Sequence, residues 1–435
     1  MDRKVDFRGK MWGNISALAA VLGFCLPSVL LSCPIFLFPS LDLPLLKGQE
    51  TAKIKLFSIR SGFVWQEEPF QIDQLDENGG ISFPKEKEVS KKIGENDRLV
   101  FSANSFGRKK PDYLDFPCKA SVVYEIIDYL DQKQANYLIF CHEAFDSKGI
   151  KRQAPLFSKE DNILFSPNYS FQFNKNNQLL FDQIALGEGK KRALAAFFSN
   201  MAIFADVKGF FSVLFGPREI QSKIVTMAGG DVGVNTNLSF FLKMLFFKIN
   251  LSLSTDVSFY NDSVYLPMVL YFPVDAKKYL HPTSGLLYHW ALAEKFQEEM
   301  TVSMPEFSAA TFTKEANNKD VIAKFCQKKY CDFSFGLTKP SPLVMSFRLD
   351  KELVASGFYP IFVDDIEKFN QVSGWGLTSF GKARHAGFLF STVGLGEGYY
   401  SWSFWINALP EPNSKITSCP YPISLRSFLV DKNNR

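Results

Sequence analysis

Histidine and cysteine are scarce in this chain, which has four histidines and seven cysteines among 435 residues. No two cysteines form a Cys-x-x-Cys pair, and no histidine lies near Cys326 and Cys331 in the sequence, so the spacings that hold zinc are missing. Basic and acidic residues are nearly balanced, at 49 and 45, which provides no basic patch for nucleic acid. We therefore predict no metal site, no cofactor and no nucleic-acid partner.

Phenylalanine, in contrast, is abundant. The chain has 45 phenylalanines, and aromatic residues make up 15% of it, a composition that favours β-sheets. Hydrophobic residues at 46% and charged residues at 22% are typical of a globular protein. The length leaves room for two domains.

The first 33 residues have the order of an export signal. Basic residues at 3, 4, 8 and 10 precede an apolar run over 15–31, which ends in Leu30-Leu31-Ser32-Cys33. That ending resembles the lipobox of bacterial lipoproteins, which implies that 1–32 is removed and that Cys33 carries a lipid. A cleaved soluble protein and an uncleaved anchor stay open, the latter because residues 34–38 are also apolar. The leading interpretations place the chain in the cell envelope, on the periplasmic side or the cell surface, in contact with a membrane through its N-terminal segment.

The remainder of the chain predicts a mostly β fold with two β-sandwich-like domains. The first, at 50–145, has apolar or alternating runs separated by polar, glycine-containing links. The second, at 160–435, has a run at 247–254 whose strict alternation predicts one wet and one buried face. Apolar spacing predicts inserted helices near 286–300 and 320–330, while 190–205 fits either a helix or a strand. The expected strands are 52–58, 98–104, 121–127, 135–141, 169–173, 178–184, 247–254, 264–271, 343–349, 387–392 and 399–406.

Two sequence motifs of the first domain are considered together: Pro-x-Gln-x-Asp at 69–73 and Asn-Asp-x-Leu-Val-Phe at 96–101. The proline favours an extended entry to a strand, and Asn-Asp forms a turn before a buried strand. We expect Asp73 and Asp97 to brace these turns by accepting backbone N–H groups. The combination resembles the N-terminal β domain of uncharacterised exported bacterial proteins, and a similar phrase occurs in extracellular proteins related to polysaccharide lyases. The resemblance implies an exported β-sandwich and carries no catalytic residue.

Four residues are the candidates for catalysis. A lyase-like reaction would use His385 or Tyr288 as the general base, with Arg348 or Arg384 neutralising a substrate carboxylate. The sequence does not show that these groups meet.

Tyr400, Trp402 and Phe404 alternate and therefore share one face of an expected strand. Aromatic faces stack on sugar rings, so this face is the candidate ligand-binding platform, with a place in the core as the alternative. Cys326 and Cys331 are close enough in sequence for a local disulfide in an oxidising envelope.

These observations predict a membrane-associated envelope protein with a binding or structural role. The expected ligand is an envelope polysaccharide or a partner protein. A carbohydrate-active lyase or hydrolase and a scaffold subunit of an envelope complex are the alternatives.

Overall fold

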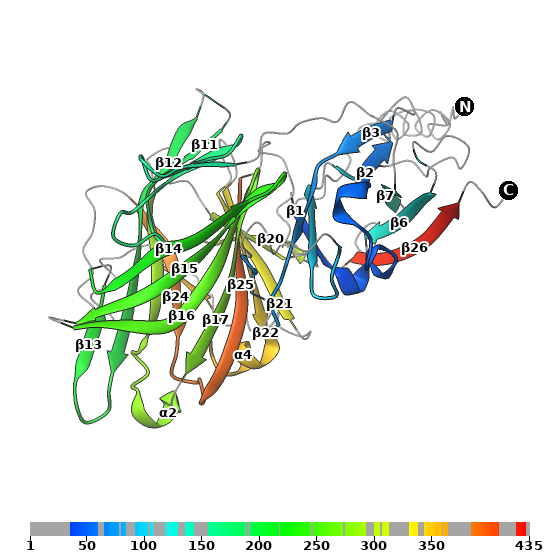
Figure 1. The fold of residues 1–435 in the computed structure, drawn as a ribbon. Helices are drawn as coiled ribbons and strands as arrows, with labels where there is room; N and C mark the ends of the chain where they lie inside the picture. Colours follow the sequence, from blue (N-terminus) through cyan, green and yellow to red (C-terminus); the bar gives the residue numbers. More distant parts are fainter. Residues whose placement is uncertain are drawn as a thin grey trace, which may run out of the picture.

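The computed structural model describes segments of the chain between residues 35 and 431, and a mostly β fold is confirmed in them (Figure 1). The export segment and Cys33 lie outside the described residues. The described segments are 35–59, 65–77, 80–83, 92–102, 105–107, 118, 120–128, 135–142, 155–187, 189, 192–216, 218–244, 247–272, 275–292, 300–304, 307–312, 330–337, 343–358, 360–363, 384–408 and 423–431.

The first unit is a sandwich of two antiparallel sheets. The smaller sheet has the order β1 (Ile35–Pro39), β5 (Arg98–Ser102), β4 (Phe70–Asp73). The larger has the order β26 (Ile423–Asp431), β6 (Ala120–Asp128), β7 (Ala135–His142), β2 (Ile54–Ile59), β3 (Trp65–Glu68). Three single-turn helices, Ser40–Asp42, Pro44–Leu46 and Thr51–Lys53, follow β1. The core between the sheets is aromatic, with Phe38 stacked on Phe101 at 5.3 Å between ring centroids.

The expected boundaries of the first domain need correction at both ends. Residues 35–39 lie before the expected start at 50, yet they form β1, in which Ile35 and Phe36 are buried. Residues 423–431 lie at the far end of the chain, yet they form β26, which pairs with β6 along its whole length. The first and the last described strands of the chain therefore both belong to the first unit.

The second unit consists of two larger antiparallel sheets (Figure 1). One sheet has the order β23 (Pro360–Val363), β24 (Arg384–Ser391), β18 (Gly285–Leu292), β12 (Ala193–Asp206), β11 (Phe181–Leu186), β10 (Tyr169–Phe173), β9 (Ile163–Phe165), β8 (Leu156–Ser158), with β13 (Ser212–Phe215) also on β12. The other has the order β14 (Ile220–Gly229), β15 (Gly233–Met244), β16 (Phe247–Tyr260), β17 (Ser263–Phe272), β25 (Gly398–Ala408), β22 (Leu343–Asp350), β21 (Tyr330–Leu337), β19 (Met300–Met304), β20 (Phe307–Phe312).

Alternation along the strands builds the core between these two sheets. Phe171 and Phe173 project from β10, and Phe347 from β22 meets Phe404 from β25 with ring centroids 4.6 Å apart. Two short helices, α2 (Ala276–Tyr279) and α4 (Lys351–Ala355), each start at an aspartate that accepts a backbone N–H.

The helix expected at 286–300 is wrong over its described part, because 285–292 is strand β18. Leu286 and Trp290 are four residues apart, and four is an even number, so one face of a strand accommodates them as well as one face of a helix. In β18, Trp290 is buried in the inter-sheet core. Of the ambiguous 190–205 segment, 193–205 lies in strand β12. Of the helix expected at 320–330, residues 320–329 lie outside the described residues, and Tyr330 opens strand β21.

A disulfide joins Cys118 and Cys141, with the Cα atoms 5.6 Å apart. It lies in a buried cluster on the outer face of the five-stranded sheet, with Phe57 and Ile139. The sequence analysis expected a different pair. Cys326 lies outside the described residues, and Cys331 is in β21.

Candidate functional site

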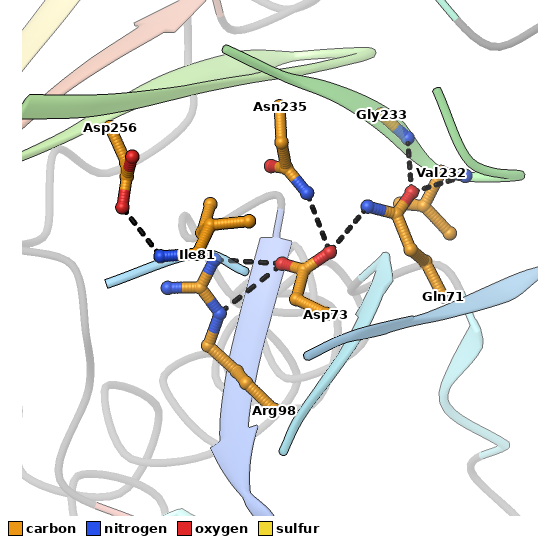
Figure 2. Close-up of polar contacts among 8 residues, drawn as sticks. All are labelled: Gln71, Asp73, Ile81, Arg98, Val232, Gly233, Asn235 and Asp256. Carbon is orange, nitrogen blue, oxygen red and sulfur yellow. Dashed lines mark hydrogen bonds and ion pairs between the residues drawn. The ribbon is translucent and has the colours of Figure 1, made fainter. Parts of the chain in front are cut away.

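A group of buried polar side chains centres on Asp73, where the first unit meets the second (Figure 2). Asp73 ends β4 and pairs across the sheet with Arg98 at the start of β5. The Arg98 Nη2 donates to Asp73 Oδ2 at 2.7 Å, and its Nε donates to the same oxygen at 3.3 Å. The Gln71 amide, two residues earlier on the same face of β4, donates to Asp73 Oδ1 at 2.6 Å.

The second unit supplies the remaining partners from β15 and the turn before it. Asn235 Nδ2 donates to Asp73 Oδ1 at 2.7 Å. The backbone N–H groups of Val232 and Gly233 donate to Gln71 Oε1 at 3.3 and 2.9 Å. Figure 2 shows these groups converging from the two units. We call Gln71, Asp73, Arg98 and Asn235 the interface network.

A second polar contact between the units lies beside it. Asp256 on β16 accepts the backbone N–H of Ile81 at 2.6 Å through Oδ2. Its other oxygen accepts the amide of Asn237 at 2.9 Å, which orients the carboxylate. The apolar cores also meet here, because Val232, Tyr260 and Trp405 of the second unit pack in the core of the first.

Arg98 is held in its charged form in this low-dielectric environment. Burial alone lowers the pKa of Arg98, but charge interactions with Tyr260, which act only once that tyrosine ionises at high pH, and with Asp73 outweigh it and raise that pKa above its ordinary value. The guanidinium also lies over the ring of Tyr265, 5.6 Å from its centroid. Burial raises the pKa of both tyrosines, so both are neutral near pH 7.

Asp73, at the centre of the interface network, is saturated rather than poised for chemistry. Each Asp73 oxygen accepts two hydrogen bonds, and the side chain is 1% exposed. A general base needs a free lone pair within reach of a substrate, and a buried, fully bonded carboxylate offers none. The arrangement therefore binds one unit to the other.

Asp97, one residue before Arg98, behaves as the sequence predicted. Its Oδ2 accepts the backbone N–H of Gly94 at 2.7 Å and closes the turn before β5. Burial, as the largest cause, raises the pKa of Asp97, and the nearby charge of Asp73 acts in the same direction. Asp73 was expected to brace a turn in the same way, but its described partners are the side chains listed above.

The four candidate catalytic residues are spread over two sheets. Tyr288 on β18 faces the inter-sheet core, 5.9 Å from Trp290 between ring centroids. Arg348 lies on β22 of the opposite sheet, between the core residues Phe347 and Leu349, so alternation directs it to the outer face. Arg384 and His385 lie on β24, opposite Leu292 and Ala291 in register. The described side chains, Tyr288 and Arg348, do not form a common site.

The expected aromatic platform is largely part of the core. Phe404 is 7% exposed, and Trp402 packs on the buried ring of Phe358 with centroids 5.0 Å apart. Tyr400 is half-buried and donates its hydroxyl to the carbonyl of Gly396. This face of β25 points into the sandwich, because the opposite sheet covers it. The core alternative is the correct one for Phe404.

A narrow gap between the two sheets of the second unit has apolar walls that include Phe171, Phe259 and Leu238. Its volume is about 30 Å³. One water requires at least roughly 10–15 Å³, so the gap has space for one or two waters and no organic ligand. Among the described residues, no group of three or more His, Cys, Asp or Glu converges on a metal position.

The sequence analysis missed an exposed aromatic turn. Between β12 and β13 the chain turns over Lys208-Gly209-Phe210-Phe211, where Gly209 has a φ of +75°. Phe210 is 82% exposed and Phe211 is 61% exposed. Two adjacent phenylalanines after a Lys-Gly turn were the available signal, but in this phenylalanine-rich chain they did not stand out.

Comparisons with known proteins leave the chain without a family. No protein family and no curated protein matches the sequence. Among solved structures, an α-mannosidase from Enterococcus faecalis V583 aligns with 90% of this chain and 42% of its own, at 7% identity and a TM-score of 0.41. A glycosyl hydrolase family 38 protein from Enterococcus faecalis aligns with 90% of this chain and 44% of its own, at 7% identity and a TM-score of 0.40.

The Slr1438 protein from Synechocystis sp. PCC 6803 aligns over its whole length with 61% of this chain, at 9% identity and a TM-score of 0.28. This chain therefore spans less than half of each enterococcal protein. At these TM-scores the likenesses establish neither a shared fold nor a shared activity. In the part of the chain that the structure describes, no helix has the length and apolar character of a membrane span.

Proposed function

We propose that this chain is an exported, non-catalytic protein of the cell envelope, related to the exported β-sandwich proteins that its N-terminal phrases resemble. It has a binding or structural role, and it is held at a membrane through a lipid on Cys33 or through the apolar N-terminal segment. The interface network carries this proposal, because its buried carboxylate, Asp73, has both oxygens occupied by Gln71, Arg98 and Asn235, and the bond from Asn235 joins the two units. The separation of Tyr288 from Arg348 on opposite sheets supports the non-catalytic role.

The disulfide between Cys118 and Cys141 supports the exported location, since such bonds persist in oxidising compartments. The location is tested by fractionating cells and by metabolic labelling with a fatty-acid analogue. Label on the wild-type chain that is lost in Cys33→Ala is expected. A chain found only in the cytoplasm would overturn the proposed location.

The binding role is tested on the full chain in mild detergent with acidic and neutral envelope polysaccharides. Binding and the appearance of new reducing or unsaturated ends are followed together. We expect no new ends, with binding either to a polysaccharide or to an envelope partner recovered by cross-linking. Cleavage of any polysaccharide would overturn the non-catalytic role, and Tyr288→Phe would then be the first variant to assay.

A further inference from the structure

We infer that the turn between β12 and β13 is a membrane-contacting tip, whose partner is the interfacial region of a lipid bilayer that contains anionic lipid. The tip is defined here as residues 206–212 together with helix α2. It lies at the end of the second unit that is remote from the first unit (Figure 1). It is therefore a contact additional to the proposed N-terminal anchor.

The tip is a preformed protrusion. The backbone N–H of Val207 donates to the carbonyl of Phe211 at 2.9 Å, and that of Phe210 donates back to Val207 at 3.1 Å, which closes the turn. Helix α2 supports it from one side, because the N–H of Lys208 donates to the carbonyl of Tyr279 at 2.9 Å. The exposed rings of Phe210 and Phe211 thus extend from an ordered base, and little conformational entropy remains to be lost on contact.

Large apolar side chains line this base as well. Tyr279 on α2 is 53% exposed, and Leu214 on β13 is 36% exposed. Exposed apolar side chains that occur singly need no explanation, whereas exposed apolar groups gathered in one place mark interaction surfaces. Phe210 and Phe211 are adjacent in the chain, and the hydrogen bond between the Lys208 N–H and the Tyr279 carbonyl holds the backbone of Tyr279 beside their turn. Tyrosine and phenylalanine are the rings that occupy the boundary between lipid headgroups and acyl chains.

Basic groups flank the rings. Lys208 extends its ammonium group to the carbonyl of Lys277 at 2.7 Å, which places two lysines beside the turn. Lys278 is the third, and its ammonium lies 3.7 Å from Asp275. The other nearby carboxylate, Asp206, accepts the hydroxyls of Ser212 and Thr283, and these two bonds lower its pKa and keep it ionised. Three lysines against these two carboxylates leave the tip with a net positive charge. Lysine stems lie along apolar surface while their ammonium groups reach lipid phosphates.

The shape of the tip favours lipid over a protein partner. A protein partner would need a pocket complementary in shape to two adjacent rings on a convex turn. The fluid interface of a lipid bilayer accommodates a protrusion of any shape. The apolar apex with charged groups of net positive sign behind it also matches the order of acyl region and anionic headgroups met on entering a bilayer.

The test is hydrogen exchange by mass spectrometry on the full chain, with vesicles of phosphatidylethanolamine and phosphatidylglycerol, so that the tip is read separately from the N-terminal segment. Amides of 206–212 are expected to exchange about tenfold more slowly when roughly 90% of the tip is bound. The double variant Phe210→Ser/Phe211→Ser should lose this protection. Leu156→Ser, at a residue 58% exposed on β8, is the matched control and should keep it.

Three results would overturn the inference. The first is a chain that floats with the vesicles while 206–212 exchanges as in free protein, an outcome that leaves the proposed function standing. The second is full protection in the double variant, which would show that the rings are not the contact. The third is protection of the tip only in concentrated, lipid-free protein, which would identify a second copy of the chain as its partner.

Discussion

Removing the charge of Asp73 should cost far more stability than removing a charge from an exposed ion pair. In Asp73→Asn the side chain keeps its size and an acceptor oxygen, but Arg98 is left as an uncompensated cation that is 11% exposed. Breaking a buried pair in this way costs about 3–5 kcal/mol. The matched control is Glu95→Gln, which breaks a pair with Lys47 whose side chains are 60% and 48% exposed. Exposed pairs contribute up to roughly 1 kcal/mol.

The assay is urea unfolding of the full chain in mild detergent, followed by circular dichroism and by limited proteolysis. Because the network joins the units, Asp73→Asn should also split one cooperative transition into two. Adding Arg98→Met removes the unpaired cation. The loss in free energy of unfolding of the double variant should therefore be smaller than the sum of the losses of the two single variants. A cost for Asp73→Asn no greater than that for Glu95→Gln, or strict additivity in the double variant, would refute the reasoning.

Three further changes test other parts of the fold. Replacing Cys118 and Cys141 by serine opens a loop of 23 residues, which should lower the free energy of unfolding by about 3 kcal/mol in urea titrations without reductant; an unchanged midpoint would contradict it. In Gly233→Ala the new Cβ would lie 2.4 Å from the Tyr260 ring and 2.6 Å from a backbone carbonyl, so a loss of about 1–3 kcal/mol is expected by thermal or urea unfolding. Asp97 has a raised pKa in the folded chain, above its ordinary 3.8, so the folded state loses stability as pH rises from about 4 towards neutral. The stability of Asp97→Asn relative to the wild type should therefore increase over that range, as measured by unfolding titrations at several pH values. A stability difference between the two proteins that does not change with pH would disprove the assignment.

The strands that the sequence predicted well are those whose pattern is local. Alternation over 247–254 and the apolar run at 135–141 both correspond to strands of the structure, β16 and β7. The helix expected at 286–300 failed because residues four apart share a face in both a helix and a strand, so Leu286 and Trp290 could not decide between them.

Contacts between residues far apart in the chain could not be predicted from the sequence, for a different reason. Strand β26 pairs with β6 across about three hundred residues, and Asn235 lies 162 residues from Asp73. Periodicity reports which face of a strand is buried, but it holds no information about which partner covers that face. The first unit was therefore predicted without its first and last strands, and Asp73 was predicted to brace a local turn instead of bonding a residue of the second unit.

Burial along β4 shows why that phrase has its composition. Gln71 and Asp73 are buried, whereas Phe70 and Ile72 are only half-buried, the reverse of an ordinary surface strand. The apolar pair packs on the core of the first unit, and the polar pair faces β15 of the second. A slip of one residue would turn the phenylalanine and isoleucine towards Asn235 and leave Arg98 without its carboxylate. The alternating polar residues thus specify one register of docking between the units, a specificity that an apolar face of the same size would lack.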